Sequence, residues 1–532
     1  MKCPVILRNL SEKFRLFEAG RIVATLSGVL LLFGVCFAWA AEPAARAALP
    51  NIVVILCDDL GYGDVHAFNP DRCKIPTPHF DRLAGQSLVF TDAHSTSSVC
   101  TPSRYSLLTG RYNWRTVRQS GVGDGYSPPL IASGRLTLPA LLKQHGYTTA
   151  CIGKWHLGLG IAKNNDNKPD YSKPLLQGPT TCGFDYFYGI SASLDMPPYI
   201  WIENDRFVGV PTVKKKYVRE GDAHKDFEAM DVLPALVKKA VAFIGEQSSR
   251  NQRYFLYLPL TSPHTPIVPT PEWQGKSPIG LYGDFVMQTD AAVGEVMKAI
   301  ENTPQADNTL LIVTSDNGYA PYAGMEIGPS RNAVRLVEAK GHFPSAGFRG
   351  YKADIWEGGH RMPFMARWPA VIKKPAASSQ TICQSDLLAT FADILGVKLP
   401  ETAGEDSVSL LPLLRGENRP VREAIVHHSI HGRFAIRQGP WKLCLCPGSG
   451  GWASPTDAEA RRQGLPAVQL YNLEKDPGET NNLQAQNPEM VRQLTALLER
   501  YVADGRSTPG APQTNDARIH IMPNPTSPAR QQ

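Results

Sequence analysis

The chain has 532 residues, of which 42% are hydrophobic and 20% are charged, so it can bury a large core and is not an intrinsically disordered protein. Its formal charge of +6 falls to about +3 without residues 1–40, which hold five basic and two acidic side chains. So small a net charge gives no reason to expect a nucleic-acid partner.

Residues 1–40 have the pattern of an export signal. Basic side chains precede an apolar run over residues 22–39, which ends in the small-residue exit Ala-Trp-Ala before Glu42. An uncleaved membrane anchor is the alternative, because the run is nearly long enough to span a bilayer. Two glycines in the run and the alanine-rich exit favour cleavage. We therefore expect an exported protein, periplasmic or secreted, with no stable membrane association after cleavage.

Three continuous apolar, β-branched runs predict buried parallel strands, and each run stops at a cluster of polar residues. The runs cover residues 51–57, 254–260 and 309–314. Helical patterns lie between them, over residues 138–145 and 284–300. This order predicts an α/β domain over residues 50–400, with a large, mostly parallel sheet sandwiched by helices. Such sheets bind ligands beyond the carboxyl ends of their strands, where the polar clusters fall.

The sequence changes character after about residue 400. Short β-like stretches, separated by Gly and Pro, cover residues 424–428, 434–437, 441–444 and 469–473. They predict a small antiparallel sheet, followed by a helix with Asn487 as N-cap, Pro488 at its first position and Gly505 as its stop. We expect a small α+β subdomain over residues 420–505. Residues 506–532, rich in Pro, Thr and Asn, are expected to be disordered.

Two of the polar clusters carry hard oxygen ligands. Asp58 and Asp59 follow the first strand, and Asp316 and Asn317 follow the third. Four such oxygen side chains suit Ca²⁺ or Mg²⁺ and disfavour zinc, which prefers His or Cys. Adjacent acids after a strand are more often simple turn formers, so the residues alone leave both readings open.

The segment CTPSR, residues 100–104, is the sharpest motif. Thr101 is expected to cap a short helix with Pro102 at its first position, which places Cys100 at the positive end of that helix. An anionic substrate is favoured there. Further along, Lys154 and His156 alternate in the phrase GKWHLG, so on an extended backbone both point to one face. Both motifs also have a purely structural interpretation. Cys100 would then be an ordinary buried cysteine, and Lys154 a solvated lysine beside a structural histidine.

CTPSR and its extension LLTGR, residues 107–111, resemble the type I sulfatases of the alkaline phosphatase superfamily. In that family the Cys-X-Pro-X-Arg motif directs oxidation of its cysteine to formylglycine (3-oxoalanine). The resemblance covers residues 50–400 and the phrase LYNLEKDPGETNNL at 470–483. Within the family, the chain looks most similar to arylsulfatase A and N-acetylgalactosamine-6-sulfatase. This implies a sulfuric ester hydrolase acting on sulfated carbohydrates, matured by a formylglycine-generating enzyme.

The resemblance also implies a metal site. The phrase DDLGYGD, residues 58–64, resembles the sulfatase metal loop, and TSDNG, residues 314–318, resembles its partner. The implied ligands are Asp58, Asp59, Asp316 and Asn317. The family favours Ca²⁺ over Mg²⁺, which the spacing does not distinguish.

The catalytic residues implied by the resemblance come from four motifs in family order along the chain. They are Cys100, Arg104, Lys154, His156, His264 and Lys352. A sulfate monoester is negatively charged and repels nucleophiles. Arg104, Lys154 and Lys352 are therefore expected to screen that charge and to stabilise the charge that develops as the S–O bond breaks.

The expected chemistry starts from hydrated formylglycine at position 100. One hydroxyl of this geminal diol attacks sulfur with Asp316 as the base, while His264 or Lys352 protonates the departing alcohol. His156 then deprotonates the second hydroxyl, which expels sulfate and re-forms the aldehyde. An unmodified cysteine lacks that exit and is expected to stall after one turnover, or not to react.

Two other functions compete with this one. A phosphonate or phosphate ester hydrolase of the same superfamily carries the same pentapeptide, and a non-catalytic relative that binds sulfated glycans would keep the fold. Substrate specificity is expected in residues 191–205 and 331–348, which match no motif. Tyr199, Trp201 and His342 in these segments are candidates for stacking on or bonding a sugar ring.

Overall fold

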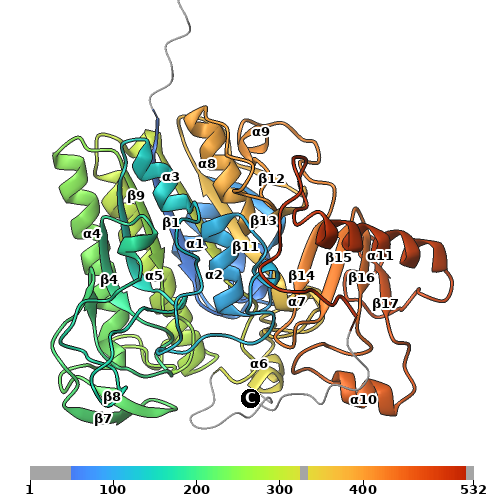
Figure 1. Cartoon of the computed structure of the whole chain (residues 1–532), viewed down its shortest axis with the longest axis horizontal. Helices are drawn as coiled ribbons and strands as arrows, with labels where there is room; N and C mark the ends of the chain where they lie inside the picture. Colours follow the sequence, from blue (N-terminus) through green and yellow to red (C-terminus); the bar gives the residue numbers. More distant parts are fainter. Residues whose placement is uncertain (1–48, 324–332, 523–532) are drawn as a thin grey trace, which may run out of the picture. The chain divides into compact units, whose positions relative to one another are not determined.

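A computed structural model describes residues 49–323 and 333–522 (Figure 1). The predicted signal peptide, residues 1–40, lies outside the described residues. Within them, every helix is too short or too polar to cross a membrane.

The main sheet contains 11 strands among the described residues, in the order β12-β2-β11-β10-β1-β9-β3-β4-β5-β6, with β13 paired to β2. The strands are β1 (Asn51–Cys57), β2 (Leu88–His94), β3 (Thr148–Lys154), β4 (Tyr186–Ile190), β5 (Ile202–Glu203), β6 (Arg206–Phe207), β9 (Tyr254–Pro259), β10 (Thr309–Ser315), β11 (Arg361–Arg367), β12 (Ala376–Ser378) and β13 (Ile382–Cys383). The three strands predicted from apolar runs are neighbours, because β1 pairs in parallel with both β9 and β10. The prediction of a mostly parallel sheet is confirmed, and β11 is the central exception, antiparallel to β10 and β2.

Helices cover both faces of this sheet. They are α1 (Pro78–Ala84), α2 (Cys100–Thr109), α3 (Leu138–Gln144), α4 (Val232–Ser249), α5 (Leu281–Glu301), α6 (Ala333–Ala339), α7 (Glu357–His360), α8 (Leu387–Leu395) and α9 (Leu411–Leu414). Successive residues of β1 point to opposite faces. Val53 and Ile55 join a hydrophobic cluster with α4 and α5, whereas Ile52, Val54 and Leu56 join another with α2, α3 and α8. The predicted sandwich therefore forms around a strand that is buried on both sides.

A second sheet of four antiparallel strands, in the order β14-β15-β16-β17, follows α9 in the chain, as predicted. Its strands are β14 (Ile425–His428), β15 (Phe434–Gln438), β16 (Trp441–Cys444) and β17 (Gln469–Asn472), accompanied by α10 (Asp457–Arg462) and α11 (Pro488–Ala503). Leu494 and Leu498 of α11 pack against Ile436 and Leu443 of the sheet, and Figure 1 shows this helix beside the strands. An additional hairpin, β7 (Val213–Lys216) with β8 (Glu220–Ala223), was not predicted.

The expectation of a disordered tail is wrong for residues 506–522. They form no helix or strand, but Asp516 lies 3.0 Å from the guanidinium of Arg111, and Asn515 accepts a hydrogen bond from Arg115 at 3.0 Å. Arg111 and Arg115 are fully buried, and buried guanidinium groups need acceptors, which the tail supplies. Residues 523–532 lie outside the described residues.

Candidate active site

The predicted site residues meet beyond the carboxyl ends of the central strands. Asp58 directly follows β1, Asp316 directly follows β10, and Lys154 is the last residue of β3. Because these strands run side by side and in parallel, their ends bring residues from distant parts of the sequence to one edge of the sheet. His264 follows β9, the strand between β1 and β3.

Cys100 is the first residue of α2 and is 3% exposed. The expected cap is wrong: the helix begins two residues earlier than predicted, and the hydroxyl of Thr101 instead accepts a hydrogen bond from the Gly123 N–H at 3.0 Å. Burial raises the pKa of the Cys100 thiol, although the ammonium groups of Lys154 and Lys352 oppose the rise. A thiol with a raised pKa is a weak nucleophile at neutral pH.

Each of three buried carboxylates is paired with a cation. Lys154 Nζ lies 2.6 Å from Asp58 Oδ2, and Arg104 Nη2 lies 2.7 Å from Asp316 Oδ2. Lys352 in turn places its Nζ 2.7 Å from Asp59 Oδ2. The six side chains are almost completely buried, so these attractions are weakly screened by water. The three predicted cations therefore lie in one buried set of charged side chains together with Asp58, Asp59 and Asp316.

The four predicted metal ligands form one cluster that fits a hard cation. Asn317 Nδ2 donates to Asp59 Oδ1 at 2.6 Å, and the Asp59 N–H donates to Asp316 Oδ1 at 3.2 Å. Two oxygens of the cluster, Asp58 Oδ1 and Asn317 Oδ1, are buried and make no hydrogen bond within the part of the chain that the structure describes. Asp58 Oδ1 has only a 3.5 Å contact with Arg104. Unpartnered buried oxygens beside carboxylates are the donors that Ca²⁺ and Mg²⁺ prefer.

Within the cluster, the carboxyl groups of Asp316 and Asp58 have different pKa values. Burial and the neighbouring Asp58 carboxylate raise the pKa of Asp316 to about 6. Burial acts on Asp58 in the same direction, but Lys154, His264 and Arg104 outweigh it and hold the pKa of Asp58 well below its usual value. Asp316 is therefore the better proton acceptor of the two near neutral pH.

His156 does not continue the strand as expected. Its backbone adopts φ +56°, so the prediction that Lys154 and His156 alternate along an extended chain is wrong. Its Nε2 lies 2.8 Å from the carbonyl oxygen of Gly123, which assigns the ring proton to Nε2. Nδ1 is buried without a partner, and burial lowers the pKa of the ring well below its usual value. The neutral ring thus presents an available lone pair.

His264 lies beside the same carboxylate as Lys352. Its Nε2 is 3.5 Å from Asp59 Oδ2, and its Nδ1 is 2.5 Å from the carbonyl oxygen of Thr265. The carbonyl fixes the orientation of the ring, so that Nε2 faces the site.

The three residues proposed to contact a sugar are packed into the protein. Tyr199 is 1% exposed and donates to the Arg219 carbonyl, and Trp201 stacks on Tyr188 with ring centroids 4.8 Å apart. His342 is fully buried, with Nε2 2.8 Å from Asp64 Oδ1. These predictions are therefore wrong, because each aromatic group already has a partner within the fold. Residues 331 and 332 of the second specificity segment lie outside the described residues.

Sequence reasoning missed residues that surround Lys352. The ring of Tyr322 lies 5.6 Å from Lys352 Nζ and 6.5 Å from the His264 ring. Asp354 accepts hydrogen bonds from the N–H groups of Trp452 and Ala453 at 2.8 and 2.9 Å, which ties the loop of Lys352 to the segment after β16. These contacts join segments about a hundred residues apart, and no local motif indicates them.

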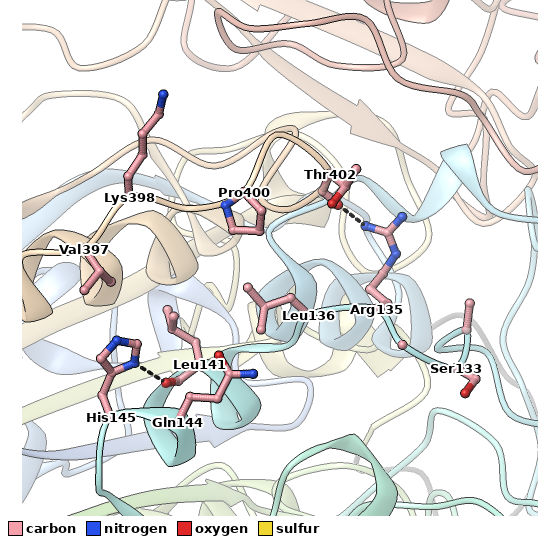
Figure 2. A pocket seen from close by; sticks show the side chains of 12 residues that line it. Ser133, Arg135, Leu136, Leu141, Gln144, His145, Val397, Lys398, Pro400 and Thr402 are labelled. Atoms are coloured by element: carbon pink, nitrogen blue, oxygen red, sulfur yellow. Dashed lines mark hydrogen bonds between the residues drawn. The ribbon is translucent and has the colours of Figure 1, made fainter.

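A separate cavity of about 570 Å³ lies between α3 and the segment after α8. Figure 2 shows Arg135 and Leu136 on one side of it and Val397 and Pro400 on the other. None of the residues that line it belongs to the predicted site. Arg135 is turned toward Glu405, at 2.9 Å, so its charge is already neutralised. We assign this cavity no part in the chemistry.

The chain is similar to several known proteins. The sequence matches the family model described as Sulfatase over residues 50–397. An N-acetylgalactosamine-6-O-sulfatase of Bacteroides thetaiotaomicron is 34% identical, over 91% of this chain and 99% of that protein. N-acetylgalactosamine-6-sulfatase of Homo sapiens is 28% identical over 89% of each chain. Arylsulfatase A of Bos taurus is 32% identical over 82% of this chain and 84% of its own.

Solved structures show the same architecture. A protein described in the metabolism of multiple glycosaminoglycans by Bacteroides thetaiotaomicron superposes with a TM-score of 0.75 at 34% identity, covering 85% of this chain and 99% of its own. A protein of Bacteroides fragilis, described as a putative sulfatase, shares the fold with a TM-score of 0.60 at 20% identity, covering 85% and 95%.

Proposed function

This chain belongs to the sulfatase family and has its alkaline-phosphatase-like fold, and from that premise we propose that it hydrolyses sulfate monoesters of carbohydrates through a formylglycine made from Cys100. It is a sulfuric ester hydrolase, as its named relatives are. The observation that best supports the proposed nucleophile is that Arg104, one turn after Cys100 in α2, donates to Asp316 at 2.7 Å and to the Lys154 carbonyl at 3.1 Å. The helix that begins with the proposed nucleophile therefore also carries a cation into the charged cluster.

Binding and charge stabilisation fall to the buried cations. Arg104, Lys154 and Lys352 contact the sulfate oxygens and stabilise the negative charge that moves onto the departing oxygen. Asp58, Asp59, Asp316 and Asn317 would hold Ca²⁺, with Mg²⁺ the less favoured ion. The bound cation adds positive charge beside the sulfate. Two oxygens of the cluster that lack hydrogen bonds support this assignment.

The proton transfers are divided among three side chains. Asp316, with its pKa raised to about 6, accepts the proton of one hydroxyl of the hydrated aldehyde as that oxygen bonds to sulfur. The S–O bond to the alcohol breaks, and His264 or Lys352 protonates the alcohol. Nδ1 of His156 then accepts the proton of the second hydroxyl, the C=O bond re-forms and the C–O bond to sulfate breaks. Sulfate leaves and the aldehyde is restored without attack of water on sulfur.

Maturation and localisation complete the proposal. Oxidation of Cys100 requires a formylglycine-generating enzyme as a partner. Residues 1–40 direct export to the periplasm or the outside of the cell and are then removed.

Mass spectrometry of the peptide containing Cys100 tests the modification. Protein co-expressed with a formylglycine-generating enzyme should show the loss of mass from thiol to aldehyde. Aryl sulfate and aryl phosphate or phosphonate esters should then be compared as substrates. Faster turnover of the phosphorus ester would support the competing hydrolase, whereas persistent cysteine without turnover would support a glycan-binding protein.

A panel of sulfated sugars identifies the substrate. The names of the relatives make 6-sulfated N-acetylgalactosamine the first candidate. Release of sulfate from it should be compared with release from 6-sulfated galactose and N-acetylglucosamine, and from isomers sulfated at other positions. We expect turnover of at least one sugar sulfate, and turnover of aryl sulfates alone would contradict a carbohydrate substrate.

A further inference from the structure

The loop that follows β4 carries a buried carboxylate that is only partly satisfied. Asp195, in one of the two segments where we expected specificity, is 8% exposed. Its Oδ2 lies 3.7 Å from Arg219 Nη1, which is longer than a hydrogen bond. Its Oδ1 is buried and has no hydrogen-bond partner among the described residues. Leaving such a group without a donor is unfavourable, so a donor from outside the chain fits this position.

Asp195 lies beside the candidate active site. The N–H of His156 donates to the carbonyl of Ser191 at 2.9 Å, which ties the start of this loop to a proposed catalytic residue. At the other end lies Tyr322, whose ring is 5.6 Å from Lys352 Nζ. Burial raises the pKa of the Tyr322 phenol, the Lys352 ammonium opposes the rise, and the Asp195 carboxylate adds to it, so both charges act on this phenol.

The loop is held in place and carries further unused polar atoms. The hydroxyls of Ser191 and Ser193 are both buried and lack a hydrogen-bond partner. Leu194, between Ser193 and Asp195, is 2% exposed and packs in the hydrophobic core of the main sheet. A loop anchored in this way keeps its polar groups in fixed positions, which reduces the entropy lost on binding.

We propose that Asp195 is a specificity-determining residue that accepts a hydrogen bond from a hydroxyl group of the sugar whose sulfate reacts. This inference rests on the proposed function and adds the chemistry of the recognised ring. A carboxylate accepts hydrogen bonds from hydroxyls and repels a second anion. The site therefore selects a sugar with a free hydroxyl at that position over one that carries a sulfate or carboxylate there.

The test compares two substrates on the same variants. Asp195→Ala and Asp195→Asn are assayed on the sugar sulfate with the highest turnover and on an aryl sulfate, which lacks ring hydroxyls. We expect the ratio of kcat/KM for the sugar to kcat/KM for the aryl sulfate to fall about tenfold to a hundredfold in the alanine variant, and less in the asparagine variant, which keeps one acceptor oxygen.

Asp185→Asn is the matched control. Like Asp195, Asp185 flanks β4, on the side of its first residue. The carboxylate of Asp185, however, is already bound by Thr149 and Lys143. Its substitution should leave the ratio unchanged. An equal loss of both activities in the Asp195 variants, or no loss, would overturn the role of Asp195. Absence of turnover of every sugar sulfate and aryl sulfate by the unsubstituted enzyme would instead contradict the proposed function itself. The asparagine variant provides the readout if the alanine variant does not fold.

Discussion

Lys352 and Asp59 are 293 residues apart in the chain, yet the Nζ of Lys352 lies 2.7 Å from a carboxylate oxygen of Asp59. Both side chains are almost fully buried, and the carboxylate raises the pKa of Lys352 against the opposing effect of burial. The ammonium therefore stays charged in a place where water would not stabilise it. This pair links the proposed metal cluster to the proposed leaving-group side of the site.

Lys352→Met removes that charge. We expect kcat on an aryl sulfate to fall about a hundredfold to a thousandfold, because a positioned charge in a dry site is among the larger contributions to catalysis. Steady-state kinetics measures the loss. Lys340→Met is the control, since the Lys340 ammonium binds the Ile279 carbonyl outside the site. A fall of less than tenfold in the Lys352 variant would contradict the assigned role.

His156→Gln separates the two halves of the reaction. The first half forms a sulfated enzyme and releases the alcohol, and only the second needs the proton acceptor Nδ1. We expect a burst of about one equivalent of phenol from an aryl sulfate, followed by a slow phase. Mass spectrometry should find sulfate attached to residue 100. Loss of the burst together with the steady rate would place His156 in the first half instead.

Calcium binding has a readout that does not depend on activity. An ion that binds the native state at 100 times its dissociation constant stabilises it by about 2.7 kcal/mol, so Ca²⁺ should raise the melting temperature of the chelator-treated protein. In Asn317→Leu the rise should shrink, because one unpartnered oxygen is lost. Equal shifts in both proteins would remove Asn317 from the ligand set. Parallel titrations with Mg²⁺ decide between the two ions.

Four buried histidines make the protein sensitive to acid. Burial lowers the pKa of His94, His360, His427 and His428. That of His428 falls to about 4. An unfolded histidine titrates near about 6.5, so between these values the unfolded chain binds a proton that the native state does not. The free energy of unfolding therefore falls as the pH drops through this window, by up to about 3 kcal/mol for His428.

Urea unfolding at pH 7 and pH 5 measures this effect. His428→Gln should lose less stability between the two values than the unsubstituted protein, because its side chain cannot take up the proton. His66→Gln changes a half-exposed histidine and should leave the difference unchanged. The same pH dependence in all three proteins would show that His428 does not contribute.

Much of the fold was predictable because the strands at its centre are buried on both faces. The run from Asn51 to Cys57 is apolar at nearly every position, and such a run predicts a central parallel strand. The helix after Asn487 was equally clear from its apolar stripe and its proline. The hairpin β7–β8 was missed because all its residues except Ala223 are exposed or only partly buried, so burial imposes no alternating pattern on it.

The sequence by itself determined the fold class, and it indicated the proposed nucleophile, oxygen ligands and cations, because each requires a side-chain type in a recognisable order. Only the tertiary structure decided how these groups are presented. The left-handed backbone of His156, the tail acceptors that bind Arg111, and the unpartnered oxygen of Asp195 depend on contacts between distant segments. A local pattern does not contain that information, since whether a buried polar atom has a partner is settled by the whole fold.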